Sequence, residues 1–480
     1  MPSEKILCTT ISARAAVQLL AMAGDLSMGQ PTDQSARSAR VAGRLALLDG
    51  AGDDVAMHAR LVALLRWSGC TANAAGFAVL LGDDVAGRDA MLRNALPVGH
   101  PLTFTNIEAL ARIHCEVAGD LAGMLELPAE VEAGLRHVWE HYDGGGAPQQ
   151  LRAPAIPAVV YYTSLAGDLE ILARTHDAQA AIRMILGWAD AKYPAALAAL
   201  AAEHADTLLA ALDGPDDDGA MPTHEVALSI VADLVELKLP WLAGYSRRVA
   251  ELAGRAAALA GLPPEQQTRL VRAALVHGVG RASVANTIWE RTGQPSRADW
   301  EKIRLAPYWT ARAGALVPAL RDESALASHM YERLDGSGYF RSLAGDALDM
   351  PQRLLAAAGA YAALCAPRPW RAAMSPQQAA QLLEEQGQAG RFDATAAGFV
   401  IAAAGGEAEG NPVPARKGLL SEREVEVLRR ISLGESNKEA ARVMQISPST
   451  VRTHMESIFR KLGCSTRAAA TLKGLTLGLI

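Results

Sequence analysis

The chain has 480 residues, of which 50 % are hydrophobic and 20 % are charged, and this globular composition excludes an intrinsically disordered protein. Five scattered cysteines without a CxxC pair give no sign of a disulfide framework or of a zinc site of that type. No run reaches the roughly 18 uninterrupted apolar residues of a membrane span, and the N-terminal segment does not resemble a secretory signal. We therefore expect a cytoplasmic protein without a membrane partner.

The formal net charge of −6 is unevenly distributed. From Arg416 to the end, twelve Lys and Arg residues stand against six Glu and no Asp, which leaves −12 on the preceding residues. A basic tail on an acidic body suggests a nucleic-acid partner for the tail, although an ordinary fluctuation of charge gives the same numbers.

The pattern along the chain indicates an all-α protein. Strand signals are almost absent, and residues 247–259 place Val249, Leu252, Ala256 and Leu259 on one helical stripe. Segments rich in Gly, Pro and acidic residues, at 212–222 and 405–415, are typical of linkers. We expect two large helical domains at 1–212 and 223–404, a linker at 405–417, and a small four-helix domain at 418–480.

The two large domains look like copies of one another. Residues 63–69 (ALLRWSG) parallel 274–280 (ALVHGVG), 211 positions later. Residues 139–146 (WEHYDGGG) parallel 331–338 (YERLDGSG), 192 positions later. Matching blocks occur in the same order in both halves, and this predicts a tandem duplication.

The second copy resembles the HD-GYP branch of the HD phosphohydrolase superfamily. The resemblance is carried by HGVGR at 277–281, YERLDGSGYF at 331–340 and RPWRAAMSPQQAAQLL at 368–383. It implies a helical bundle in which His and Asp side chains of active members gather metal ions. Those metals activate water for the hydrolysis of a phosphodiester, usually cyclic di-GMP.

Most of the family's ligand positions hold other residues in the second copy. His277 keeps the first half of the central His-Asp pair, but Gly278 stands in place of the carboxylate. The remaining ligand positions fall on Tyr245, Ala306, Met330, Tyr331, Gly359 and Ala362. We therefore expect no metal, no cofactor and no enzyme activity, and we interpret His277 as a structural histidine. The alternative is a metal-dependent cyclic di-GMP phosphodiesterase fused to a DNA-binding domain.

The first copy departs further from the family. It keeps a His and an Asp at ligand positions, His114 and Asp168. The central pair and the later His pair are replaced by Arg66 and Trp67, and by Val138 and Trp139.

Exchange of charged ligands for aromatic and apolar groups favours a pocket for an organic effector. In the second copy this tentative effector site comprises Tyr245, His277, Met330, Tyr331 and Tyr361. The same exchange is equally compatible with a filled core that binds nothing, in a domain that dimerises or acts as a scaffold.

The last sixty residues have the pattern of a small helical domain. Ser421 and Glu424 form the pattern of a capping box in front of an apolar stripe. Ser436 is placed to cap a second, short helix, and Ser447-Pro448 begins a third that Gly463 ends. A short turn followed by a longer helix is the arrangement that places a helix in the major groove of DNA.

Residues 419–469 resemble the LuxR-type helix-turn-helix domain almost position for position. The resemblance implies that Arg452, Thr453 and Glu456 face base edges, with Ser449 on the same outward face. It also implies that Thr450 and His454 approach phosphates. Two residues at a helix start, Asn437 and Lys438, suit a further phosphate. In this family the final helix commonly pairs two subunits, so we expect a homodimer on double-stranded DNA.

Together these patterns predict a DNA-binding transcription regulator. Two catalytically inactive HD-GYP-like domains would sense a small-molecule effector, dimerise, or do both, and the C-terminal domain would bind operator DNA.

Overall fold

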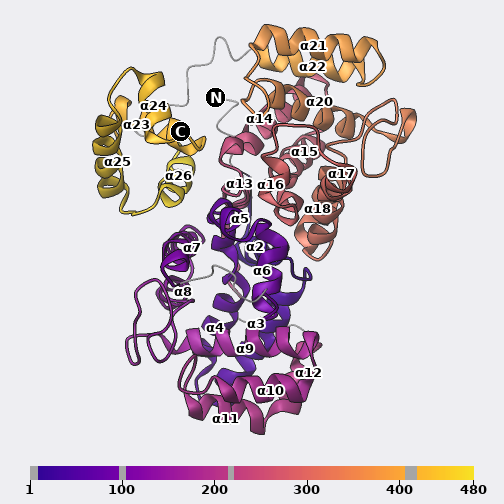
Figure 1. Cartoon of the computed structure of the whole chain (residues 1–480). Helices are drawn as coiled ribbons and strands as arrows, with labels where there is room; N and C mark the ends of the chain where they lie inside the picture. Colours follow the sequence, from indigo (N-terminus) through magenta and orange to yellow (C-terminus); the bar gives the residue numbers. More distant parts are fainter. Residues whose placement is uncertain (1–8, 97–103, 215–220, 406–418) are drawn as a thin grey trace. The chain divides into compact units, whose positions relative to one another are not determined.

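The computed structural model describes residues 9–96, 104–214, 221–405 and 419–480. The chain divides into two compact units (Figure 1). One comprises residues 12–226, and the other comprises residues 227–480 together with the strand residues Thr10 and Ile11. The linker expected at 405–417 lies outside the described residues, except for Gly405.

The expected all-α fold is confirmed. Across the described residues the strands are β1 (Thr10–Ser12) and β2 (Glu225–Ala227), which pair in a two-stranded sheet. The sequence pattern did not predict them, because three residues are too few to show alternation.

The unit of residues 12–226 is built from helices of 8 to 21 residues and one 3-10 turn. In chain order these are α2 (Ala13–Ser27), α3 (Gln34–Leu48), α4 (Asp53–Leu65), η1 (Ser68–Cys70), α5 (Ala74–Leu81), α6 (Asp84–Leu92), α7 (Phe104–Met124), α8 (Ala129–Arg136), α9 (Ala158–Thr175), α10 (Ala178–Gly187), α11 (Ala195–Glu203) and α12 (Ala205–Leu212).

The other unit begins with the second copy and ends with the small C-terminal domain. Its second-copy elements are α13 (Ser229–Glu236), η2 (Pro240–Leu242), α14 (Tyr245–Leu259), α15 (Pro264–Val276), η3 (Val279–Ser283), α16 (Asn286–Trp289), α17 (Arg297–Arg304), α18 (Ala306–Ala315), η4 (Pro318–Leu320), α19 (Arg321–Ala327), η5 (Gly345–Ala347), α20 (Met350–Leu364), α21 (Pro376–Gln388) and α22 (Ala394–Gly405). The C-terminal helices are α23 (Glu422–Ser432), α24 (Asn437–Met444), α25 (Pro448–Leu462) and α26 (Arg467–Thr476).

The helices of the two copies match in length and spacing. Helices α3 and α14 each have 15 residues, and α4 and α15 each have 13. Helices α14 and α15 begin 211 positions after their counterparts, α3 and α4. A 3-10 turn follows α4 in the first copy and α15 in the second. A glycine of each turn lies against a carbonyl oxygen. An ideal Cβ on Gly69 would lie 2.3 Å from His114 O, and one on Gly280 would lie 1.8 Å from Ala306 O. This close approach explains why both copies have glycine there.

The later matching blocks also share their hydrogen bonds. The buried carboxylate of Glu140 accepts from the backbone amides of Gln149 and Leu151 at 2.7 and 2.9 Å. The buried carboxylate of Glu332, 192 positions later, accepts from the amides of Arg341 and Leu343 at 2.8 and 3.0 Å. These bonds hold the loop that follows each block, and they support the predicted duplication.

One predicted stripe is only partly buried. Val249, Leu252 and Ala256 are fully buried in α14, whereas Leu259 is 54 % exposed. Leu259 is the last residue of the helix, so its side chain extends past the packed region.

No single helix in the described ranges is long and apolar enough to cross a membrane; the bent pair of α11 and α12 meets the criteria of length and composition only when taken together.

Candidate functional sites: a buried centre, a cavity and an exposed helix

A buried arginine lies at the centre of the second copy. Arg281 is 7 % exposed, and its Nη2 donates to Tyr331 Oη at 2.6 Å. The same nitrogen lies 3.0 Å from His277 Nε2, and His277 Nδ1 lies 2.6 Å from Ala274 O. Burial, followed by the charge of Arg281, lowers the pKa of His277 to about 3. His277 is therefore neutral: its Nδ1–H donates to the carbonyl, and its Nε2 accepts from Arg281.

Two further residues of the tentative effector site, Tyr245 and Met330, pack beside this centre. Tyr245 is 3 % exposed, and its hydroxyl donates to Gly359 O at 2.9 Å. Met330 packs against the same glycine, because an ideal Cβ on Gly359 would lie 2.0 Å from Met330 Cε. Tyr361 is also buried, and its hydroxyl lies 3.4 Å from Pro376 O. Tyr245, His277, Met330 and Tyr331 thus lie at this centre, whereas the contact of Tyr361 is with Pro376. The binding of an effector by these residues stays a prediction.

The donor set at this centre does not fit the metal ions that the family resemblance implies. Side chains of Tyr, Met, Gly and Ala supply no carboxylate, and the free nitrogen lone pair of His277 accepts from Arg281. Among the described residues, no group of three or more His, Cys, Asp or Glu side chains is placed to hold a metal ion.

In the first copy, the retained histidine also has structural contacts. His114 is fully buried, its Nε2 lies 2.8 Å from Arg66 O, and its ring stacks on Trp139 with centroids 4.8 Å apart. Burial lowers its pKa to about 3, so the ring is neutral and donates to that carbonyl. The retained carboxylate, Asp168, pairs with Lys192 at 2.6 Å.

A cavity of about 400 Å³ opens beside these residues within the first copy. Arg66 and Trp67, which replace the family's central pair, line it, as do Trp139 and Asp168. Its other lining residues include Trp188 and Lys192, from the segment after α10. The resemblance to the family had already identified Arg66, Trp67, Trp139 and Asp168. No local sequence pattern indicates that Trp188 and Lys192 line the same cavity.

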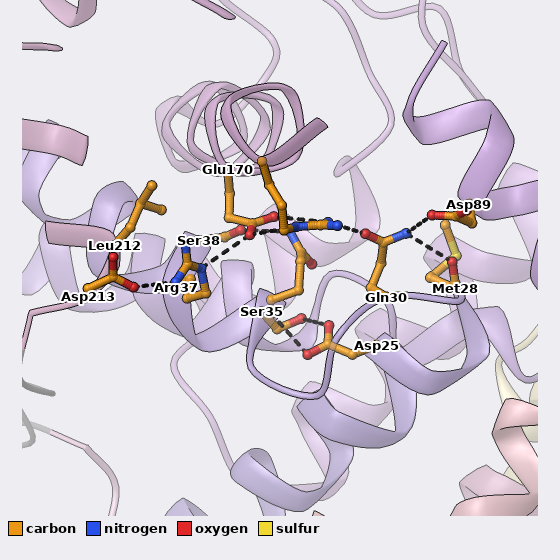
Figure 2. Close-up of polar contacts among 12 residues, drawn as sticks. Asp25, Met28, Gln30, Ser35, Arg37, Ser38, Asp89, Glu170, Leu212 and Asp213 are labelled. Carbon is orange, nitrogen blue, oxygen red and sulfur yellow. Dashed lines mark hydrogen bonds and ion pairs between the residues drawn. The ribbon is translucent and has the colours of Figure 1, made fainter. Parts of the chain in front are cut away.

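A network of polar side chains links α2, α3 and α9 in the same unit (Figure 2). The buried carboxylate of Glu170 accepts from Arg37 and Arg174 at 3.2 and 3.1 Å. Close by, Asp25 accepts from the amide and hydroxyl of Ser35 at 3.1 and 2.5 Å. Burial raises the pKa of Asp25 to about 8, even though both hydrogen bonds lower it. Asp25 is therefore largely protonated at neutral pH.

The four C-terminal helices form the helix-turn-helix arrangement that the pattern predicted. The capping boxes Ser421–Glu424 and Ser436–Glu439 are both present, and Ser447 caps α25 by accepting from Thr450 N. Glu424 has further contacts that the sequence pattern did not predict. It accepts from Ser457 Oγ at 2.7 Å and from Lys461 Nζ at 2.6 Å, and so links α23 to α25.

The predicted base-reading residues lie on the exposed side of α25. The side chain of Arg452 is 77 % exposed and that of Glu456 is 62 % exposed. Arg452 Nε donates to Glu456 Oε1 at 3.0 Å. Thr453 is exposed one position further on, and its hydroxyl donates to Ser449 O at 3.2 Å. The structure therefore presents these side chains outward, as the resemblance implied.

The predicted phosphate contacts differ in exposure. Lys438 and Thr450 are exposed, whereas Asn437 and His454 are half-buried. The side-chain oxygen of Asn437 accepts from Arg467 Nη2 at 2.9 Å, so part of its hydrogen-bonding capacity is used within the domain. The phosphate contacts of these residues remain predictions.

Comparison with known protein families identifies two parts of the chain. Residues 229–396 match the family described as HD domain, and residues 418–473 match the family described as bacterial regulatory proteins, luxR family. The chain combines an HD domain with a C-terminal LuxR-family helix-turn-helix domain.

Curated relatives include phosphodiesterases and a transcriptional regulator. The 3'3'-cGAMP-specific phosphodiesterase 3 of Vibrio cholerae is 27 % identical over 296 residues, 58 % of this chain and 64 % of that protein. Phosphodiesterase 1 of the same specificity and organism is 30 % identical over 164 residues, 34 % of this chain and 38 % of that protein. The probable transcriptional regulatory protein NarL of Mycobacterium tuberculosis is 44 % identical over 62 residues, 13 % of this chain and 29 % of that protein. The chain thus spans less than two thirds of each of these relatives.

A solved structure shares the fold of most of the chain. The crystal structure of a cyclic GMP-AMP specific phosphodiesterase of V. cholerae matches with a TM-score of 0.59 and 20 % identity, covering 83 % of this chain and 98 % of that one.

The expectation that the chain is not an enzyme is contradicted by these comparisons. Two of the relatives that match the HD domain are phosphodiesterases, and so is the protein of similar fold. The expectation rested on the identity of residues at aligned ligand positions. The likeness of the chain to phosphodiesterases extends over many more positions than those of the ligands.

Proposed function

We propose that the protein is a DNA-binding transcription regulator whose HD-type units respond to a small-molecule effector. The observation that carries the proposal is the exposed side of α25, where Arg452, Thr453 and Glu456 project from a helix whose opposite side is packed into the domain core. A helix of this kind, preceded by a short helix and a turn, fits the major groove of B-DNA. The match of residues 418–473 to the luxR family supports the same function.

A single small module buries little DNA surface, so we propose that the protein binds as a homodimer to two half-sites. The effector would act through the helical units that precede the DNA-binding domain. A DNA target is also the reason to place the protein in the cytoplasm.

The test is selection of duplexes from a random library by the full-length protein, followed by binding titrations. The selected duplex should bind at least about 1000-fold more tightly than a scrambled duplex of the same length and composition. Sedimentation of the complex should give two chains per duplex. Equal binding of selected and scrambled duplexes would contradict sequence-specific regulation, and one chain per duplex would contradict the dimer.

Hydrolysis of a cyclic dinucleotide is the second candidate function, and the phosphodiesterase relatives favour it. In such a reaction water adds to one phosphorus atom and one P–O ester bond breaks, which converts the ring to a linear dinucleotide. The test is incubation of the full-length protein with 3'3'-cGAMP, with and without added Mn²⁺, followed by chromatography of the products. Formation of the linear dinucleotide at a rate proportional to protein concentration would support this function, and an unchanged substrate would contradict it.

A further inference from the structure

The cavity of the first copy has the features of a ligand site. Its volume of about 400 Å³ lies within the range of small-molecule pockets in proteins. Its walls come from the end of α4, from α6, α7 and α9, and from the segments after α8 and after α10. All of these elements belong to the unit of residues 12–226.

One of the charged groups that line this cavity is the guanidinium of Arg66. The residue is 4 % exposed, and neither its Nε nor its Nη2 has a hydrogen-bond partner in the described part of the chain. Its Nη1 has one long contact, to Thr163 O at 3.5 Å. A buried cation with unused donors is costly unless an acceptor reaches it, so this arrangement calls for an anionic partner.

The fold holds this guanidinium in place through a glycine. An ideal Cβ on Gly167 of α9 would lie 1.4 Å from Arg66 Nη1, so a side chain at this position would displace the arginine. On another side the guanidinium lies 4.3 Å from the centroid of the Trp67 ring. The orientation of Arg66 is thus set by Gly167 of α9, which is distant in sequence, and by Trp67, the next residue along the chain.

The carboxylates of Asp168 and Glu170 act on the charge of Arg66, but both already have closer cationic partners. Asp168 and Lys192 neutralise each other in an ion pair at 2.6 Å. Burial, followed by the charge of Lys192, lowers the pKa of His141, which favours its neutral form. Glu170 is paired with Arg37 and Arg174, so it is not free to pair with Arg66.

Much of the remaining lining is aromatic or apolar, and Asn94, Thr163 and Ser164 add uncharged polar groups. Trp67, Trp139 and Trp188 contribute three indole rings, and Met91, Leu92 and Ile171 contribute aliphatic surface. Such walls suit a flat ring, because aromatic groups bury large apolar areas and stack on one another.

We propose that the first copy binds a planar aromatic anion in this cavity, with its carboxylate or phosphate on Arg66 and its ring among the tryptophans. This ligand is a candidate for the effector of the proposed regulator. Only its role as effector rests on the proposed function. Binding itself is measured without DNA, so failure of either proposal can be recognised separately.

The test uses three probes of the same ring system with the full-length protein: 2-naphthoate, 2-naphthyl phosphate and the neutral 2-naphthamide. Isothermal titration calorimetry should detect binding of at least one anion, and comparison of the two anions identifies the preferred group. The amide should bind at least 10-fold more weakly than that anion. Arg66→Met should weaken binding of the anion by about 10- to 150-fold, the value of a charge-assisted contact.

Two further variants keep the test decisive. Arg112→Met removes an exposed arginine of the same unit that does not line the cavity, and it should leave binding unchanged. If Arg66→Met does not fold, Trp188→Leu at a half-buried wall position should still weaken the binding of the anion. The proposal is overturned if neither anion binds, if the amide binds as tightly as the anions, or if a folded Arg66→Met variant retains the affinity of the natural protein.

Discussion

Arg452 and Glu456 form an ion pair one helical turn apart on the exposed side of α25, with 3.0 Å between Nε and Oε1. Both residues were predicted to read bases, and in the free protein they contact each other. An exposed pair of this kind contributes only about 0.3–0.5 kcal/mol. DNA can therefore separate the two side chains at little cost, and each can be tested alone.

Arg452→Ala is expected to reduce operator specificity. A bidentate contact of arginine with guanine discriminates by about 1–3 kcal/mol, so operator affinity should fall by roughly 5- to 150-fold. Binding to scrambled duplex should change much less. Titrations on both duplexes at one salt concentration measure the ratio. If both affinities fall equally, Arg452 does not read a base.

Glu456→Gln should strengthen binding to DNA of any sequence. The change removes a negative charge from the proposed DNA-binding surface, and it releases Arg452 from its ion pair. The release alone corresponds to about a twofold gain in affinity. The gain should shrink as salt is raised, because screening weakens the repulsion that the natural glutamate exerts. A loss of affinity confined to the operator would instead show that Glu456 accepts a hydrogen bond from a base.

Lys438→Ala should weaken binding to operator and scrambled duplex alike. Lys438 is exposed in the first turn of α24, where free amides and positive charge favour a phosphate. Loss of one phosphate contact should lower the slope of log K against log salt by about 0.9 for each subunit bound. Titrations at four salt concentrations measure that slope, with the exposed Lys302→Ala of the second copy as the control. An unchanged slope would show that Lys438 does not contact a phosphate.

Asp25→Asn should flatten the pH dependence of stability. The pKa of Asp25 is about 8 in the folded chain and about 3.9 in an unfolded one, so only the unfolded chain loses this proton between about pH 4 and pH 8. The free energy of unfolding of the natural protein should therefore fall across that window, by up to about 1.4 kcal/mol per pH unit from this group. Asparagine can still accept from Ser35 N and can donate to Ser35 Oγ, but it has no proton to lose.

Chemical unfolding at pH 5, 6, 7 and 8 measures this effect as the difference between the variant and the natural protein. The variant should gain in relative stability as the pH rises. Asp53→Asn, at an exposed position in the first turn of α4, provides the control and should show no such trend. Parallel curves for Asp25→Asn and the natural protein would contradict the raised pKa.

The sequence by itself predicted the all-α fold, the duplication and the DNA-binding domain. These features are encoded locally, because capping residues, helical stripes and turn glycines act within a few positions of one another. The capping box of Ser421 and Glu424 is an example, since its two residues find each other within one helical turn. The family resemblance also singled out Arg66 and Trp67, which stand at the positions of the family's central pair.

Only the tertiary structure decided what surrounds those positions. The sequence predicted an effector site that includes Tyr245 and Met330 in the second copy. In the structure Met330 packs against Gly359, and Arg281 occupies the centre. The sequence did not reveal that Gly167 leaves room for Arg66, or that Trp188 reaches the same cavity from the segment after α10. The pairing of Arg452 with Glu456 follows from helical spacing, but whether both side chains face solvent depends on how α25 packs. Burial, cavities and unmatched charges arise between residues distant in sequence, and such contacts leave no local pattern to read.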